Sequence, residues 1–159
     1  MVGALAYTHF PAHKLAAGAR ADRVVVLKSE RRLILMNGDH PLKEYRVALG
    51  RNPVGSKTQE GDGRTPEGQY VIDYRKADSS YHRALHISYP SAADAVQLKA
   101  RALDPGGLIM VHGIRNGVGV IGRLHQLVDW TNGCIAVRNA EIEEIWRAVP
   151  NGTPIEIRP

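Results

Sequence analysis

Hydrophobic and polar residues alternate over short stretches along most of the chain, which is typical of β-strands and not of long helices. Asn37-Gly38 separates two of these stretches and is a strong hairpin signal. In the stretch after it, Tyr45, Val47 and Leu49 share one face because side chains alternate along a strand. The pattern predicts strands at 23–28, 31–36, 42–49, 69–74, 84–89, 108–111 and 154–158.

Two longer segments have helical spacing of their apolar residues. The first, 91–103, begins with Ser91 as a cap, and the second, 140–149, follows Asn139 as a candidate N-cap. A helical turn is predicted at 124–130, and the glycine-rich segments 50–68 and 113–122 are predicted loops. The expected fold is mainly β with short helices, forming a single β-rich domain at 23–159 after a loose N-terminal segment at 1–22.

Composition excludes several classes of protein. The 159 residues are 43% hydrophobic and 23% charged, which suits one globular domain. The net charge of +5 comes from scattered basic residues, and only two Trp, six Tyr and one Phe are present, so no nucleic-acid site is predicted. No apolar stretch reaches the roughly 18 residues of a membrane span. The first 20 residues lack the basic start and unbroken apolar stretch of a secretory signal.

Two ligand-binding patterns are interpreted as structural. Gly117–Gly122 fits the dinucleotide pattern G-x-G-x-x-G, but five residues separate it from the strand ending at Val111 and its residues are poor helix formers. His82 and His86 are four residues apart, yet they lie in a predicted strand, where that spacing does not suit a shared metal. No metal and no cofactor are predicted.

The pattern that suggests catalysis surrounds Cys134, the only cysteine in the chain. His112-Gly113 ends an apolar strand, and Cys134 follows 22 positions later within Thr131–Ile135. A thiol needs a base to become a nucleophile, and an imidazole at a strand end is held rigidly and opens to a cleft. Gly133 permits backbone angles that aim two successive N–H groups at one point, which is the arrangement of an oxyanion hole.

With these residues the sequence resembles the L,D-transpeptidase catalytic domain (YkuD-like) family, whose core is His-Gly followed at a similar distance by Ser/Thr-His-Gly-Cys. The resemblance covers about residues 23–158, and further matching segments are 47–53, 61–68, 85–90 and 104–113. It implies the family's β-rich fold with Cys134 as the nucleophile and His112 as its base. The Gly113 carbonyl would orient the imidazole, and the N–H groups of Gly133 and Cys134 would hold the oxyanion.

The chain departs from the family pattern at two positions that concern the substrate. Asn132 replaces the usual His before Gly-Cys, and Ala136 replaces the basic residue commonly found two positions after the cysteine. Arg138 and Arg115 are the candidates to take over recognition of substrate carboxylates. The candidate substrate-binding residues are His86, Arg115, Thr131, Asn132 and Arg138.

The resemblance implies a cell-wall enzyme, periplasmic or facing the cell wall, that acts on peptidoglycan stem peptides through a Cys134 thioester without a cofactor. Resolution of the thioester by an amine would make it an L,D-transpeptidase. Resolution by water would make it an L,D-carboxypeptidase or endopeptidase. Two alternatives stay open, a catalytically idle peptidoglycan-binding module and a cytosolic thiol amidase.

Overall fold

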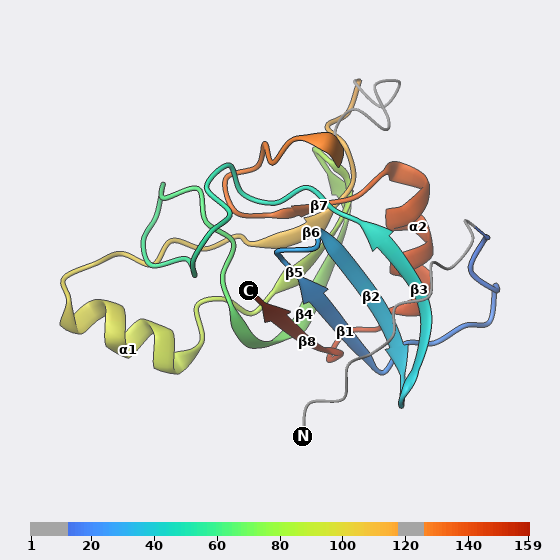
Figure 1. Cartoon of the computed structure of the whole chain (residues 1–159), viewed down its shortest axis with the longest axis horizontal. Coiled ribbons are helices and arrows are strands. Elements are labelled where there is room, and N and C mark those ends of the chain that lie inside the picture. The colour runs from blue at the N-terminus through green and yellow to red at the C-terminus, as the bar shows by residue number, and fades with distance from the viewer. Residues whose placement is uncertain (1–12, 118–125) are drawn as a thin grey trace.

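The computed structural model describes residues 13–117 and 126–159, which form one mixed sheet and two helices (Figure 1). Eight strands lie in the order β3-β2-β1-β8-β4-β5-β6-β7. The strands are β1 (Arg23–Leu27), β2 (Arg32–Asn37), β3 (His40–Arg46), β4 (Gly68–Ser79), β5 (His82–Ile87), β6 (Met110–His112), β7 (Ile135–Ala136) and β8 (Pro154–Arg158), and the helices are α1 (Ala92–Ala100) and α2 (Asn139–Ala148).

The first and last strands, β1 and β8, lie side by side in the middle of the sheet. β1, β2 and β3 form an antiparallel meander, and Gly38 takes a positive φ of 56° in the hairpin between β2 and β3. β8 pairs in parallel with β1 and antiparallel with β4, so the last strand joins the meander to the second half of the sheet. That second half ends with the short parallel pair of β6 and β7. His112 lies on β6, and Cys134 directly precedes β7.

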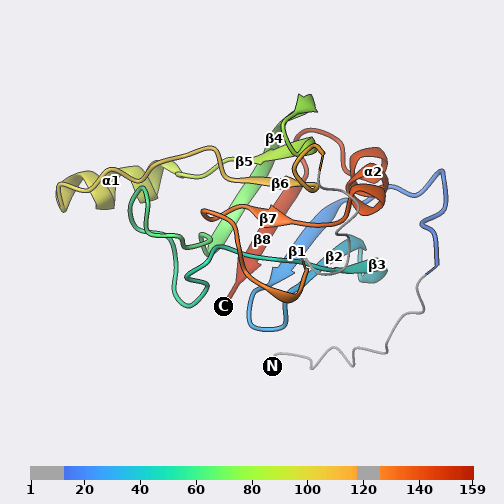
Figure 2. The ribbon, with the colours of Figure 1, turned by 90° about the horizontal axis from the view of Figure 1, so that it is seen from above.

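The core lies between the sheet and α2. Ile142 and Ile145 of α2 pack with apolar side chains of both halves of the sheet, whereas α1 lies at the opposite end of the molecule (Figures 1 and 2). The described part of segment 1–22 also packs here. Leu15 is buried, its N–H donates to Glu144 Oε2 at 3.0 Å, and the Ala21 N–H donates to the Ala148 carbonyl at 2.9 Å.

The expected mainly β fold with two short helices is confirmed, with local differences. β4 runs on to Ser79 instead of ending near residue 74. Ser91 is the N-cap of α1 as predicted, but the N-cap of α2 is Arg138, so the prediction for Asn139 is wrong. Glu141 accepts from the Arg138 N–H at 3.0 Å and frees Asn139, whose Oδ1 accepts from the Ile114 N–H at 2.8 Å.

The remaining expectations concern segments described only in part. Within 124–130, a short 3-10 turn occupies residues 126 and 127, and residues 124 and 125 lie outside the described chain. Residues 118–122 of the glycine pattern and of loop 113–122 also lie outside it. Among the described residues, no helix is long and apolar enough to cross a membrane.

Candidate active site

Strand pairing brings Cys134 and His112 to the same face of the sheet. β6 and β7 are parallel, with Val111 opposite Ile135 and His112 opposite Ala136. Val111 and Ile135 belong to the core, so His112 and Ala136 point to the other face. Cys134 lies two residues before Ala136 and therefore shares the face of His112. A cleft of about 490 Å³ opens on that face, and its lining includes Cys134, His112, Arg115, Trp130, Thr131 and Asn132.

The imidazole of His112 is held in one tautomer. Its ring is buried, and Nδ1 lies 2.6 Å from the Gly113 carbonyl oxygen, which can only accept a hydrogen bond. Nδ1 therefore carries the proton and Nε2 remains as a proton acceptor. Tyr81 packs on the ring with centroids 4.4 Å apart. Burial lowers the pKa of His112, and the hydrogen bond to Gly113 opposes that change only in part, so the imidazole is a neutral base near pH 7.

The thiol of Cys134 is half-buried and is neutral in the resting site. Burial raises the pKa of Cys134, while the Met110 backbone N–H and the positive charge of Lys57 oppose the rise. Sγ donates to the Leu108 carbonyl at 3.4 Å. The thiol hydrogen bond is thus directed to Leu108 and not to His112.

The turn before Cys134 uses backbone groups differently from the sequence prediction. Gly133 has a positive φ of 130°, and a Cβ there would lie 2.6 Å from the Arg64 carbonyl oxygen, so only glycine fits. The Gly133 N–H donates to Thr131 Oγ1 at 3.1 Å, and Thr131 Oγ1 donates to the Cys134 carbonyl at 2.7 Å. The prediction that the Gly133 N–H faces an oxyanion is therefore corrected, because this donor stabilises the turn. Among the described residues, none accepts a hydrogen bond from the Cys134 N–H. This N–H therefore remains the backbone candidate for binding an oxyanion.

Thr131 was expected to bind substrate, but its side chain has a structural role in the turn. Thr131 is only 4% exposed although it borders the cleft. Its Oγ1 both accepts from Gly133 and donates to Cys134, so the hydroxyl holds the turn of residues 131–134, the Cys134 turn, together.

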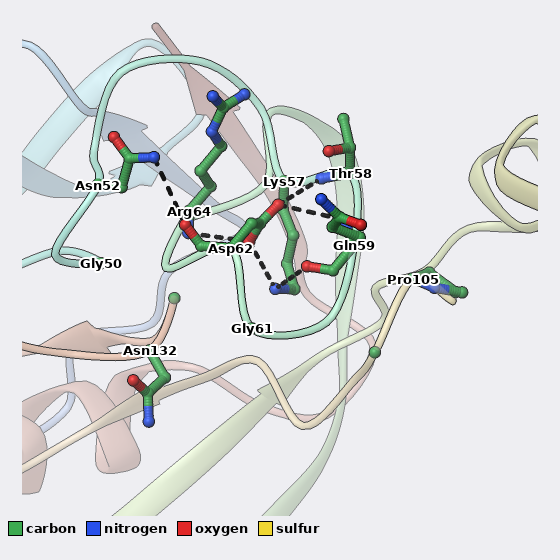
Figure 3. A network of polar contacts seen from close by, with 12 residues as sticks. Gly50, Asn52, Lys57, Thr58, Gln59, Gly61, Asp62, Arg64, Pro105 and Asn132 are labelled. Atoms are coloured by element: carbon green, nitrogen blue, oxygen red, sulfur yellow. Dashed lines mark hydrogen bonds and ion pairs between the residues drawn. The ribbon is translucent and has the colours of Figure 1, made fainter. Parts of the chain in front are cut away.

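A loop between β3 and β4, residues 50–67, is organised around the carboxylate of Asp62 (Figure 3). Asp62 Oδ2 accepts from the N–H groups of Thr58 at 2.9 Å and Gln59 at 3.1 Å, and Oδ1 accepts from Arg64 N at 3.0 Å and Lys57 Nζ at 2.9 Å. Burial alone would raise the pKa of Asp62, but these hydrogen bonds outweigh it and bring the pKa to about 2. Asp62 is thus ionised across the neutral range and fixes the shape of the loop. Asp62 lies in the matching segment 61–68, but the sequence pattern indicated no role for it.

The same loop packs directly against the Cys134 turn, residues 131–134. Gly50 forms a parallel bridge with Thr131. A Cβ at Gly50 would lie 2.1 Å from the Gly63 carbonyl oxygen and 3.1 Å from Gly133 Cα, so backbone meets backbone there. This close contact explains why glycines occur on both sides of the junction.

Asn132, the residue that replaces the family's usual His, is bound by this loop. The Arg51 guanidinium donates from Nη1 to Asn132 Oδ1 and from Nη2 to the Gly61 carbonyl at 3.1 Å. Asn132 borders the cleft, but its amide oxygen is already occupied by Arg51. No sequence signal pointed to Arg51, because it lies 81 positions from Asn132.

The two candidate arginines differ in position. Arg138 reaches Glu141 from Nε at 3.2 Å and Nη2 at 3.4 Å and caps α2 without lining the cleft. Arg115 is exposed and lines the cleft close to His112. Ala136 is 3% exposed and is bridged to Ala48, so the position of the family's usual basic residue is enclosed in this chain.

His82 and His86 have separate carboxylate partners. His82 Nε2 lies 2.8 Å from Glu143 Oε1, and His86 Nδ1 lies 2.6 Å from Asp73 Oδ1. In the described parts of the chain, no group of three His, Cys, Asp or Glu residues is placed to hold a metal ion.

Residues 21–157 match the profile of the family described as the L,D-transpeptidase catalytic domain, YkuD. The chain is also 29% identical over 132 residues to the Escherichia coli K12 protein named "Putative L,D-transpeptidase YafK", covering 79% of this chain and 46% of that protein. It thus spans about half the length of the curated relative that it matches.

Solved structures share the fold. Pgp2 of Campylobacter jejuni, described as a helical cell shape determining protein, superposes with a TM-score of 0.67 at 24% identity, over 89% of this chain and 48% of that one. L,D-transpeptidase 3 of Mycobacterium tuberculosis, solved with a faropenem-derived adduct, gives a TM-score of 0.53 at 14% identity, over 86% and 60% of the two chains.

Proposed function

The chain belongs to the L,D-transpeptidase catalytic-domain family, and from this premise we propose that it performs cysteine-dependent acyl transfer on peptidoglycan stem peptides. The observation that carries the proposal is the placement of Cys134 and His112 on one face of the β6–β7 pair, in one cleft. The Gly113 carbonyl supports it further, because it leaves His112 Nε2 free to accept a proton.

In the first step, His112 Nε2 accepts the thiol proton as Cys134 Sγ attacks the carbonyl carbon of the bond between the L-centre of the diamino acid and D-alanine. The carbonyl oxygen becomes an oxyanion beside the Cys134 N–H. The intermediate collapses to a thioester, and the D-alanine amine leaves with the proton from His112. Because the pKa of the thiol is raised and that of the imidazole is lowered, proton transfer accompanies the attack and no thiolate–imidazolium pair precedes it.

In the second step, a nucleophile resolves the thioester. An amine of a neighbouring stem gives a crosslink, and water gives hydrolysis; in both cases His112 takes a proton from the nucleophile and returns one to the thiolate of Cys134. Hydrolysis is the second candidate outcome. It is favoured by the enclosed Ala136 and by the engagement of Asn132 with Arg51, since neither residue supplies a charged clamp for an acceptor.

Arg115 is the residue proposed to bind a substrate carboxylate. It is exposed, lines the cleft, and follows the base by three positions. Guanidinium groups bind carboxylates in bidentate fashion, which suits the acidic groups of stem peptides. With this substrate, the proposed location of the protein is the periplasm or a position facing the cell wall.

An acylation experiment distinguishes the enzyme from an idle binding module. We expect incubation with faropenem to add one covalent adduct to the intact protein, located on Cys134 by peptide mass spectrometry. The Cys134→Ser protein is the matched control and should carry no thioester. If the wild-type protein binds peptidoglycan but never acquires an adduct and never releases D-alanine from a tetrapeptide stem, the binding-module alternative is correct.

A further inference from the structure

A row of side chains leads from the thiol across the sheet. Tyr74 on β4 pairs with His86 on β5, and His86 pairs with Met110 on β6. The next residue along this row is Cys134, because Val111 pairs with Ile135 and each position lies one residue earlier. Paired residues project from the same face of a sheet. Met110 and Cys134 line the cleft, and His86 and Tyr74 follow them on the same face of the sheet, beyond the cleft lining.

An irregularity in β4 shapes the far end of this row. Ile72 pairs with Ile87 and Tyr74 with His86, so Asp73 is an extra residue opposite the shorter β5. Such a bulge redirects side chains. Here the Asp73 carboxylate reaches His86, with Oδ1 2.6 Å from Nδ1. The imidazole is thereby fixed against Tyr74.

The Tyr74 ring stacks on the His86 ring, which covers one face of Tyr74 and leaves its outer face open. Their rings are stacked at a centroid distance of 4.3 Å and an interplanar angle of 11°. The hydrogen bonds that join β4 to the β8 side end at Ile72, so Tyr74 lies on an open stretch of strand and is 42% exposed. The Asp73 side chain is also 42% exposed. An exposed aromatic face therefore stands beside an exposed carboxylate.

We propose that Tyr74 and His86, held by Asp73, form a sugar-binding subsite for the N-acetylmuramyl residue of the donor strand, an inference that rests on the proposed function. A pyranose ring has one face of C–H groups that packs on an aromatic ring, and hydroxyl groups at its edge that donate to a carboxylate. A plain peptide offers no such flat face.

The separation of Tyr74 from the thiol fits the length of a stem peptide. Three strand spacings of about 4.8 Å place Tyr74 about 14 Å from Cys134 across the sheet. The diamino acid whose carbonyl is attacked is the third residue from the sugar. Three extended residues span roughly 10 Å, and the lactyl link and the side-chain linkage of the second residue supply the rest.

The test measures binding, so it does not depend on turnover. Calorimetric titrations of the Cys134→Ala protein would compare a tetrapeptide stem with the same stem carried on its disaccharide. We expect the disaccharide form to bind about five- to tenfold more tightly. Adding Tyr74→Ala should remove that difference, and adding Tyr74→Phe should retain it because the ring remains. Val96→Ala on α1, where Val96 is 71% exposed, is the control for a surface truncation and should also retain it.

Each outcome decides a different point. Equal affinity for the two ligands in the Cys134→Ala protein, or an unchanged preference after Tyr74→Ala, overturns the sugar subsite and leaves the proposed reaction intact. Loss of stem binding in every variant, with retained folding by circular dichroism, contradicts the proposed function and the subsite with it. A preference lost in Tyr74→Ala and kept in Tyr74→Phe supports both.

Discussion

The carbonyl of Gly113 lies 2.6 Å from Nδ1 of His112, its neighbour in sequence, and fixes which nitrogen of the ring can act as a base. The imidazole needs no carboxylate to hold this tautomer. A Cβ at Gly113 would lie 2.6 Å from Asn139 Oδ1 and 3.0 Å from the Tyr81 carbonyl oxygen, so the chain must pass close to both. The imidazole of His112 is therefore positioned by backbone packing and by Asn139, the first residue of α2.

Removal of either reacting side chain should abolish acylation. We expect Cys134→Ala to form no adduct with faropenem and His112→Gln to slow its formation by at least about a thousandfold, because nucleophile and base act as one unit. Adduct formation followed by intact mass gives the rate. His82→Gln is the matched histidine control, since His82 pairs with Glu143 outside the cleft lining, and it should acylate at the wild-type rate.

The pH profile of acylation should reflect a neutral base and a neutral thiol. Burial lowers the pKa of His112 from 6.5, so the acidic fall in rate is expected below pH 6.5. Burial raises the pKa of Cys134 above 9.0, so the rate should not rise steeply between pH 7 and 9. A tenfold gain per pH unit in that interval, measured by stopped-flow mixing with faropenem, would identify a free thiolate and contradict the general-base route.

Asp62 should contribute to stability in a pH-dependent way. Its pKa of about 2, against the ordinary value of 3.8, corresponds to about 2 kcal/mol of stability that is present above pH 4 and is lost as the pH falls toward 2. We expect Asp62→Asn to lower the free energy of unfolding by about this amount at pH 7 and to differ little from wild type near pH 2. Urea titrations at several pH values measure it. Asp78→Asn, on an exposed stretch of β4, should change stability little at either pH.

Gly133→Ala should disrupt the Cys134 turn. The positive φ of 130° and the 2.6 Å approach of a Cβ to the Arg64 carbonyl oxygen predict a loss of at least about 2 kcal/mol. Acylation should slow as well, because the turn carries Cys134. Gly107→Ala is the control, since a Cβ there meets nothing within 4 Å. Wild-type stability of Gly133→Ala in urea would show that the loop can retreat and that this packing is not required.

Arg115→Ala should weaken the use of acidic stem peptides. A charged hydrogen bond contributes roughly 1.5–3 kcal/mol, and exposure reduces it, so KM should rise by about tenfold with a smaller change in kcat. D-Alanine release from a tetrapeptide stem measures both constants. Arg138→Ala removes an arginine that lies outside the cleft lining and should leave KM unchanged. The reverse result would restore Arg138 as the residue that recognises the carboxylate.

Features that depend on neighbouring residues could be predicted from the amino-acid sequence. Alternation of apolar residues located each described strand except the two-residue β7, Asn37-Gly38 located the hairpin, and Ser91 located the N-terminus of α1. These are short-range effects of backbone preference and local hydrogen bonding. The family motif likewise singled out Cys134 and His112, because its residues keep their order and spacing along the chain.

The contacts of the groups near the thiol could not be predicted in this way, because they depend on how distant segments pack. Gly133 gives its N–H to Thr131, and Asn132 gives its amide oxygen to Arg51, a partner 81 positions away. The role of Asp62 depends on the loop that it holds in shape, because that loop packs against the Cys134 turn. Such contacts arise from strand register and from loops packing backbone to backbone, and they join segments whose separation along the chain carries no periodic signal.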